Sequence, residues 1–87
     1  MTEAPVGKEF IFKLPNGIVV GRAKNIDELI HLIKTAPIDA VLYHAKGNHF
    51  SPWLDMLGFK EIAKKLSSTP INDKTARITL LRILKSF

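Results

Sequence analysis

The sequence predicts an α+β fold in which an N-terminal two-stranded β-hairpin packs on a small bundle of four to five helices. An alternating apolar pattern before a Leu-Pro-Asn-Gly turn at residues 14–17, with an apolar run after it, indicates the hairpin. Apolar residues at intervals of three and four, which are typical of amphipathic helices, dominate the rest of the chain. The length of 87 residues suits one small domain. We therefore expect residues 1–87 to form a single domain, with residues 1–7 disordered.

The hairpin is predicted in the segment KEFIFKLPNGIVVGRA. Phe10, Phe12 and Leu14 would share one apolar face, because successive side chains of a strand point to opposite sides. Pro15 supplies the fixed φ that a type I turn needs, and Gly17 is free to take the left-handed conformation. Two strands alone are marginally stable in water, so the ribbon must lie on the helices that follow.

The first helix is predicted from a capping box. Asn25 and Glu28 have the N-x-x-E spacing in which each side chain bonds a free amide of the first turn. An apolar stripe follows at helical intervals and consists of Ile26, Leu29, Ile30 and Ile33.

Two shorter helices are expected in the middle of the chain. After Pro37, a second stripe is formed by Ile38, Val41, Leu42 and Ala45, although AVLYHA also fits a short strand. Ser51 and Pro52 suit the N-cap and first position of a third helix, and Gly58 suits its end.

The last two helices have clear apolar faces. The stripe of the first is Phe59, Ile62, Ala63 and Leu66, and the segment SSTPIND then breaks the chain, with Asn72 or Asp73 as the next cap. The second is expected over roughly residues 73–86, with a core-facing arc of Ala76, Leu80, Ile83, Leu84 and Phe87. Ile78 and Leu81 fall outside this arc, so they either form a contact surface among lysines or pack beneath the hairpin.

The positive charge is concentrated in one half of the chain. Residues 46–87 carry eight Lys or Arg against three Asp or Glu, whereas the two kinds balance in residues 1–45. Such a surface attracts anionic partners, and the alternative is a lysine-rich surface that only confers solubility. The predicted basic contact face consists of Lys74, Arg77, Ile78, Leu81, Arg82 and Lys85.

Several chemistries find little support in the composition. The chain has no cysteine, which excludes disulfides, thiol nucleophiles and Cys-based zinc sites and fits a reducing compartment. No apolar stretch approaches the roughly 18 residues of a membrane span, and the N-terminus lacks a signal-peptide pattern. We expect a cytoplasmic protein that uses no cofactor and no metal and does not bind a membrane.

The stretch YHAKGNHFSPWL at residues 43–54 concentrates polar and aromatic side chains. A metal site would need His44, His49 and Asp55 to converge, with His31 as a further ligand, but the zincin spacing is missing. An acid/base site would pair His44 or His49 with Ser51, oriented by Asp39 or Asp55. In a structural interpretation, Phe50, Trp53 and Leu54 fill the core while Ser51 caps a helix. The candidate residues of this central motif are Tyr43, His44, Asn48, His49, Ser51 and Trp53.

Several short motifs resemble a family of small uncharacterised archaeal and bacterial domains. They are the F-x-L-x-N-G strand at residues 12–17, ELxxLI at 28–33, the Tyr-His pair, N-x-FS-x-WL at 48–54 and IAKKL at 62–66. The positions that match the central motif are Tyr43, His44, Asn48, Phe50, Ser51, Trp53 and Leu54. The resemblance implies a hairpin with helices and an accessory role without established activity. His49 stands where we expect an acid in this family.

These observations predict an accessory or protein-interaction domain without catalytic activity. Its partner would be another protein or a second copy of the chain. The alternative is a helix-turn-helix-like nucleic-acid-binding protein that uses the basic C-terminal helix, with Lys74, Thr75, Arg77 and Arg82 toward phosphates or bases. The break of about six residues is longer than the three or four residues of that motif's turn.

Overall fold

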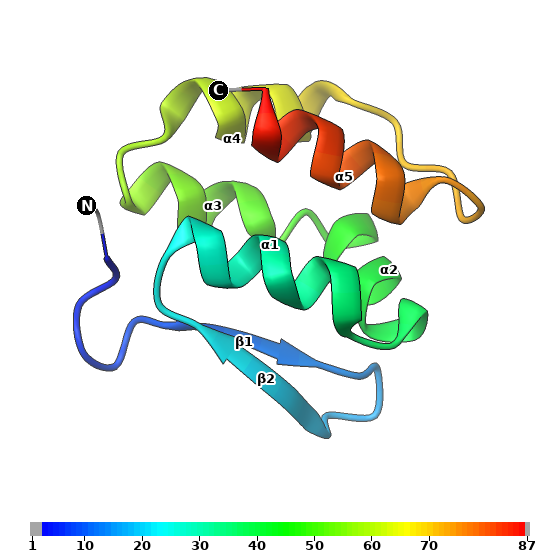
Figure 1. Ribbon diagram of the computed structural model, residues 1–87, viewed down its shortest axis with the longest axis horizontal. Helices are drawn as coiled ribbons and strands as arrows, with labels where there is room; N and C mark the ends of the chain where they lie inside the picture. The colour runs from blue at the N-terminus through cyan, green and yellow to red at the C-terminus, as the bar shows by residue number, and fades with distance from the viewer. Residues whose placement is uncertain (1–2, 87) are drawn as a thin grey trace.

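The computed structural model describes residues 3–86 and contains two strands followed by five helices (Figure 1). The elements are β1 (Phe10–Lys13), β2 (Val19–Ala23), α1 (Ile26–Thr35), α2 (Ile38–Lys46), α3 (Phe50–Met56), α4 (Lys60–Ser68) and α5 (Ala76–Lys85). The predicted α+β class and the hairpin-first order are confirmed. In Figure 1 the ribbon lies on one side of the molecule, α4 and α5 lie on the opposite side, and α1, α2 and α3 are between them.

The hairpin is antiparallel and closes through the predicted turn. Gly17 has a φ of 93°, and its N–H donates to the Leu14 carbonyl at 2.9 Å. Phe10 pairs with Ala23 across the ribbon, and the register shifts after Phe12. Phe10 and Phe12 are buried as predicted, so the aromatic face of β1 is the face that meets the helices.

Helix α1 packs against β2 on one side and against α5 on the other. The Asn25 half of its capping box is confirmed, because the Glu28 N–H donates to Asn25 Oδ1 at 2.9 Å. The Glu28 carboxylate accepts from the Lys24 N–H at 2.9 Å, one residue before the cap. Close approach to β2 depends on Gly21, since a Cβ at this position would lie 2.6 Å from Leu32 Cδ2.

The N-terminal segment is placed against the start of α1. The Ala4 N–H donates to the Lys24 carbonyl at 2.6 Å, and Glu3 forms an isolated bridge with Asn25. The prediction of disorder over residues 1–7 is therefore wrong for Glu3 and Ala4, while residues 1 and 2 lie outside the described part.

Helix α2 forms where predicted, but its buried face is different. Ala40, Val41 and His44 are buried, whereas Ile38 is exposed. The predicted stripe placed Ile38 on the apolar face and did not include His44. That prediction is wrong because an imidazole can enter a core when both of its nitrogens find partners.

Helix α3 begins at Phe50, so the predicted N-cap at Ser51 and first position at Pro52 are wrong. The Ser51 hydroxyl instead donates to Asn48 Oδ1 at 2.8 Å. The end of the helix is as predicted. Gly58 has a φ of 95°, and the amides of Gly58 and Phe59 donate to the carbonyls of Asp55 and Leu54, which is a Schellman motif.

Helix α5 starts later than predicted. The Asn72 side chain accepts from the Lys74 N–H at 2.8 Å and closes a turn, and the helix begins only at Ala76. Its core face is confirmed, apart from Phe87, which lies outside the described residues. Leu81 packs against the core, while Ile78 is 59% exposed.

Within residues 3–86, no helix combines the length and apolar character that crossing a membrane requires.

The burial of Phe12 predicts the effect of shortening it. Phe12 is 0% exposed, so Phe12→Ala should lower the free energy of unfolding by about 3–5 kcal/mol in urea denaturation. Ile18 is 57% exposed on the same ribbon, and Ile18→Ala should cost about 0.5 kcal/mol or less. Similar losses for the two variants would contradict the burial of the aromatic face of β1 against the helices.

Candidate functional site: the turn after α2 and the α3–α4 groove

The turn that ends α2 is a second Schellman motif. The His49 N–H donates to the His44 carbonyl at 2.9 Å, and the Asn48 N–H donates to the Ala45 carbonyl at 3.2 Å. Asn48 takes the left-handed conformation, with a φ of 54°, where such a motif usually has glycine. An apolar contact commonly joins the first and last residues of this motif. Here the two residues are His44 and His49.

The imidazoles of His44 and His49 form a direct pair, which we call the imidazole pair. Nδ1 of His44 lies 3.0 Å from Nδ1 of His49. Nε2 of His44 accepts from the Lys13 backbone N–H at 2.9 Å, which leaves the proton of neutral His44 on Nδ1. His44 therefore donates to His49, and the proton of neutral His49 is on Nε2.

The His44 side chain lies inside an aromatic cluster and is 2% exposed. Its ring contacts Phe10, Phe12 and Tyr43 edge-on, with centroid distances of 4.9, 4.9 and 5.0 Å. Burial lowers the pKa of His44 to about 4, and the nearby His49 and Lys13 add to this effect. The ring is thus neutral at neutral pH and acts as a hydrogen-bonding member of the core.

The ring of His49 covers Gly47. A Cβ at Gly47 would collide with Nε2 of His49 and would lie 2.8 Å from its Cε1. Gly47 has a φ of −83°, so close approach, and not backbone conformation, explains the glycine. Together these contacts hold the chain at Asn48 in one position.

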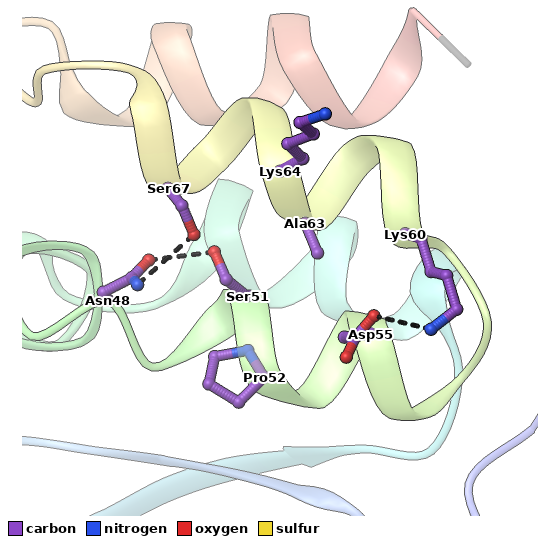
Figure 2. Close-up of a pocket in the computed structure, with 8 residues that line it drawn as sticks. All are labelled: Asn48, Ser51, Pro52, Asp55, Lys60, Ala63, Lys64 and Ser67. Atoms are coloured by element: carbon purple, nitrogen blue, oxygen red, sulfur yellow. Dashed lines mark hydrogen bonds and ion pairs between the residues drawn. The ribbon is translucent and has the colours of Figure 1, made fainter.

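Asn48 joins this turn to α4 through its side chain. Figure 2 shows Asn48, Ser51 and Ser67 converging at one end of a groove between α3 and α4. Asn48 Oδ1 accepts from Ser51 Oγ at 2.8 Å, and Asn48 Nδ2 donates to Ser67 Oγ at 3.4 Å. Ser51 is 5% exposed, whereas Asn48 and Ser67 are exposed.

The α3–α4 groove has a volume of about 410 Å³. Ala63 lines it from α4, and an ion pair between Asp55 and Lys60, at 3.4 Å, lies at the end away from Asn48 (Figure 2). Lys64 belongs to the α4 side of the lining, and its ammonium points away from α3 and Asn48 (Figure 2). The lining residues are Asn48, Ser51, Pro52, Asp55, Lys60, Ala63, Lys64 and Ser67.

Two residues of the predicted basic contact face, Arg77 and Leu81, are engaged inside the protein. The Arg77 guanidinium donates to the carbonyls of Lys34 and Ala36 at 3.2 and 2.7 Å, which caps the C-terminus of α1. Leu81 packs on the core, whereas Lys74, Ile78, Arg82 and Lys85 are exposed. A hydrogen bond with the Lys34 side chain and its like charge lower the pKa of Lys85.

The central motif also divides. His44, His49 and Tyr43 meet at the imidazole pair, and Asn48 and Ser51 meet in the groove. Trp53 points elsewhere, since its indole N–H donates to the Lys8 carbonyl at 2.8 Å and ties down the chain before β1.

This arrangement does not assemble the chemistry considered from the sequence. The Ser51 hydroxyl donates to Asn48 rather than to an imidazole. Within residues 3–86, no three His, Cys, Asp or Glu side chains come close enough to hold a metal ion.

Sequence reasoning missed the α4 side of the groove. Lys60, Lys64 and Ser67 lie at i, i+4 and i+7 and so share one helix face, which the sequence does show. Their relation to Asn48 depends on α3 packing against α4, which periodicity does not reveal.

Comparison with protein-family models, curated proteins and solved structures finds no match. The resemblance to the family of small archaeal and bacterial domains therefore stays a prediction.

Capping by Arg77 predicts a specific cost for a conservative change. Lysine keeps the charge but lacks the planar fork that reaches two carbonyls, so Arg77→Lys should lower the free energy of unfolding by about 1–3 kcal/mol. Arg82→Lys on the exposed side of α5 is the matched control, with an expected change below about 0.5 kcal/mol. Equal urea-denaturation midpoints for the two variants would contradict the capping role.

The low pKa of His44 predicts acid sensitivity with a defined sign. Its folded pKa of about 4 is below the ordinary value of 6.5, so the unfolded chain takes up the proton first. The stabilisation is complete above pH 6.5 and disappears as the pH falls to about 4. Between pH 7 and 4.5 the loss should be about 2 kcal/mol.

The test compares wild type with His44→Gln, whose amide oxygen can accept from Lys13 but does not titrate. Urea denaturation at the two pH values should show the stability advantage of wild type shrinking by that amount. An advantage that is independent of pH would mean that His44 is not held neutral by the fold.

Proposed function

We propose that the protein is a small interaction module that binds an acidic segment of a partner protein in the α3–α4 groove. The observation that supports this most directly is a set of hydrogen-bond donors in the groove that the hydrogen bonds between Asn48, Ser51 and Ser67 do not use. An anionic group is the ligand that such a set fits best.

The donor inventory follows from the contacts. Ser67 Oγ accepts from Asn48, so its own hydroxyl hydrogen is free to donate. Asn48 Nδ2 has a second hydrogen, and its oxygen is already occupied by Ser51. The Asp55 carboxylate lies beside Lys60, which reduces its repulsion of an incoming anion.

The charge around the groove favours the same kind of ligand. Lys64 lines the groove from α4, and among residues 3–86 no carboxylate lies within ion-pair distance of it. Lys65 follows on α4, and both side chains are exposed. Lys60, Lys64 and Lys65 exceed Asp55 and Glu61 by one charge in this region, and this excess favours the approach of acidic segments to a surface that offers neutral donors.

The histidines support a binding role over a catalytic one. A general base needs a free nitrogen within reach of a substrate proton. Both nitrogens of His44 are engaged, and Nδ1 of His49 accepts from His44.

The nucleic-acid alternative uses α4 and α5 as a helix-turn-helix unit. The segment between these helices is residues 69–75, and Arg77 is engaged with α1. Both facts favour the acidic protein segment over duplex DNA.

The proposal predicts binding of a synthetic hexa-aspartate peptide at low salt. Lys64→Ala should weaken this binding about three- to fivefold, equal to about 0.6–1 kcal/mol, measured by isothermal titration calorimetry. Lys24→Ala removes the same charge from an exposed residue beside α1 and should leave the affinity nearly unchanged.

Equal losses for Lys64→Ala and Lys24→Ala would reduce the effect to net charge and remove the groove from the proposal. Tighter binding of duplex DNA than of the peptide at the same ionic strength would favour the nucleic-acid alternative. Light scattering of the free protein tests whether the partner is instead a second copy of the chain.

A further inference from the structure

We infer that the imidazole pair is a proton-operated latch on the α3–α4 groove. One added proton separates His44 from His49, opens the turn at residues 44–49 and withdraws Asn48 from the groove. Acidification therefore weakens binding of an acidic ligand. The identity of the ligand rests on the proposed function, whereas the conformational step does not.

The hydrogen-bond pattern of the neutral imidazole pair leaves no ring nitrogen that can take up an additional proton without facing another N–H. In the neutral pair, the unprotonated nitrogens are Nε2 of His44 and Nδ1 of His49. A proton on Nε2 of His44 would face the Lys13 N–H at 2.9 Å. A proton on Nδ1 of His49 would face the N–H of His44 at 3.0 Å. Exchanging tautomers only moves the conflict from one contact to the other.

The surroundings do not stabilise an imidazolium. The titratable groups that face the pair are Lys13 from β1 and Tyr43 from α2, and the remaining ring neighbours are Phe10, Phe12 and Phe50. An ammonium repels a second positive charge, and neither a phenol nor a phenyl ring supplies a negative one. Moving the rings apart into water is the available relief.

The turn converts this movement into a change in the groove. The left-handed conformation is less favourable for Asn than for glycine, although Asn tolerates it better than other residues do, and surrounding contacts support it. For Asn48 these contacts are the two backbone hydrogen bonds of the Schellman motif and the pair of rings that joins its ends. When the rings separate, Asn48 loses the conformation in which it reaches Ser51 and Ser67.

The sign of the pH effect separates this latch from simple electrostatics. A protein that gains positive charge on acidification should bind an acidic peptide more tightly. The latch predicts the opposite, because the donor group of Asn48 leaves the groove.

The experiment measures hexa-aspartate affinity by isothermal titration calorimetry at pH 7.5 and 5.0 at constant ionic strength. The peptide remains about nine-tenths ionised at pH 5.0, so its own titration contributes little. Wild-type affinity should fall at least about threefold. Increased or constant affinity would overturn the latch.

Two variants identify the group responsible. His49→Asn places an amide oxygen near the position of Nδ1, where it can accept from His44 without titrating, so the loss of affinity at pH 5.0 should disappear. His31→Gln removes an exposed imidazole of α1 that does not line the α3–α4 groove, and it should retain the wild-type loss. A loss that persists in His49→Asn would overturn the assignment to the imidazole pair.

A measurement without ligand keeps the latch separate from the proposed function. The side-chain amide signals of Asn48 in ¹H–¹⁵N NMR spectra should shift between pH 7.5 and 5.0 in wild type and should not shift in His49→Asn. If this is observed and the peptide does not bind at pH 7.5, the proposed ligand is wrong and the latch stands. If the Asn48 amide signals stay unchanged between pH 7.5 and 5.0 in wild type, the latch is wrong whatever the peptide does.

Discussion

The organisation of this domain depends on how the Lys13 amide of the β-hairpin is satisfied. This N–H donates to Nε2 of His44 rather than to the partner strand, so the hydrogen bond joins the ribbon to α2. A buried amide without a partner costs about 1–3 kcal/mol, and an apolar side chain at position 44 would leave it in that state. The ring must also be neutral to accept, and a neutral ring with Nε2 occupied carries its proton on Nδ1.

The turn after α2 follows from that proton. Nδ1–H of His44 is buried and needs an acceptor, which His49 provides from the far end of the Schellman motif. The ring of His49 then lies over residue 47 and requires glycine there. Gly47 is not in the left-handed conformation, and Asn48 adopts it instead. Asn is the non-glycine residue type that tolerates this conformation best. One hydrogen bond on the ribbon thus constrains four residue types in turn, at positions 44, 49, 47 and 48. The side-chain amide of Asn48, the last of them, enters the α3–α4 groove.

Local signals made the ribbon, the capping box of α1 and the end of α3 predictable. Each depends on residues within a few positions of one another, such as Asn25 with Glu28, or on a glycine with positive φ. The buried position of His44 was not predictable from periodicity, because its partner Lys13 is 31 residues away. The same holds for Arg77, whose acceptors lie on α1, and for Ser67, which meets Asn48 only after α3 packs on α4. The density of polar side chains at residues 43–54 did indicate the right region, while the role of each side chain depended on tertiary contacts.

The basic residues of the C-terminal half differ in the same way, because some form contacts within the protein and others are exposed to a partner. Arg77 donates to carbonyls at the negative end of the α1 dipole, and Lys46 forms an ion pair with Asp73 at 2.7 Å. The side chain of Lys34 lies close enough to Lys85 to lower the pKa of Lys85. Lys64 differs because Asn48 and Ser67 place neutral donors in the same groove. Several exposed lysines attract many different anions weakly. Hydrogen-bond donors beside a charged group are directional, so they select for the shape of the anionic group. Selectivity in this protein therefore depends less on its net charge than on the conformation of the turn that positions Asn48.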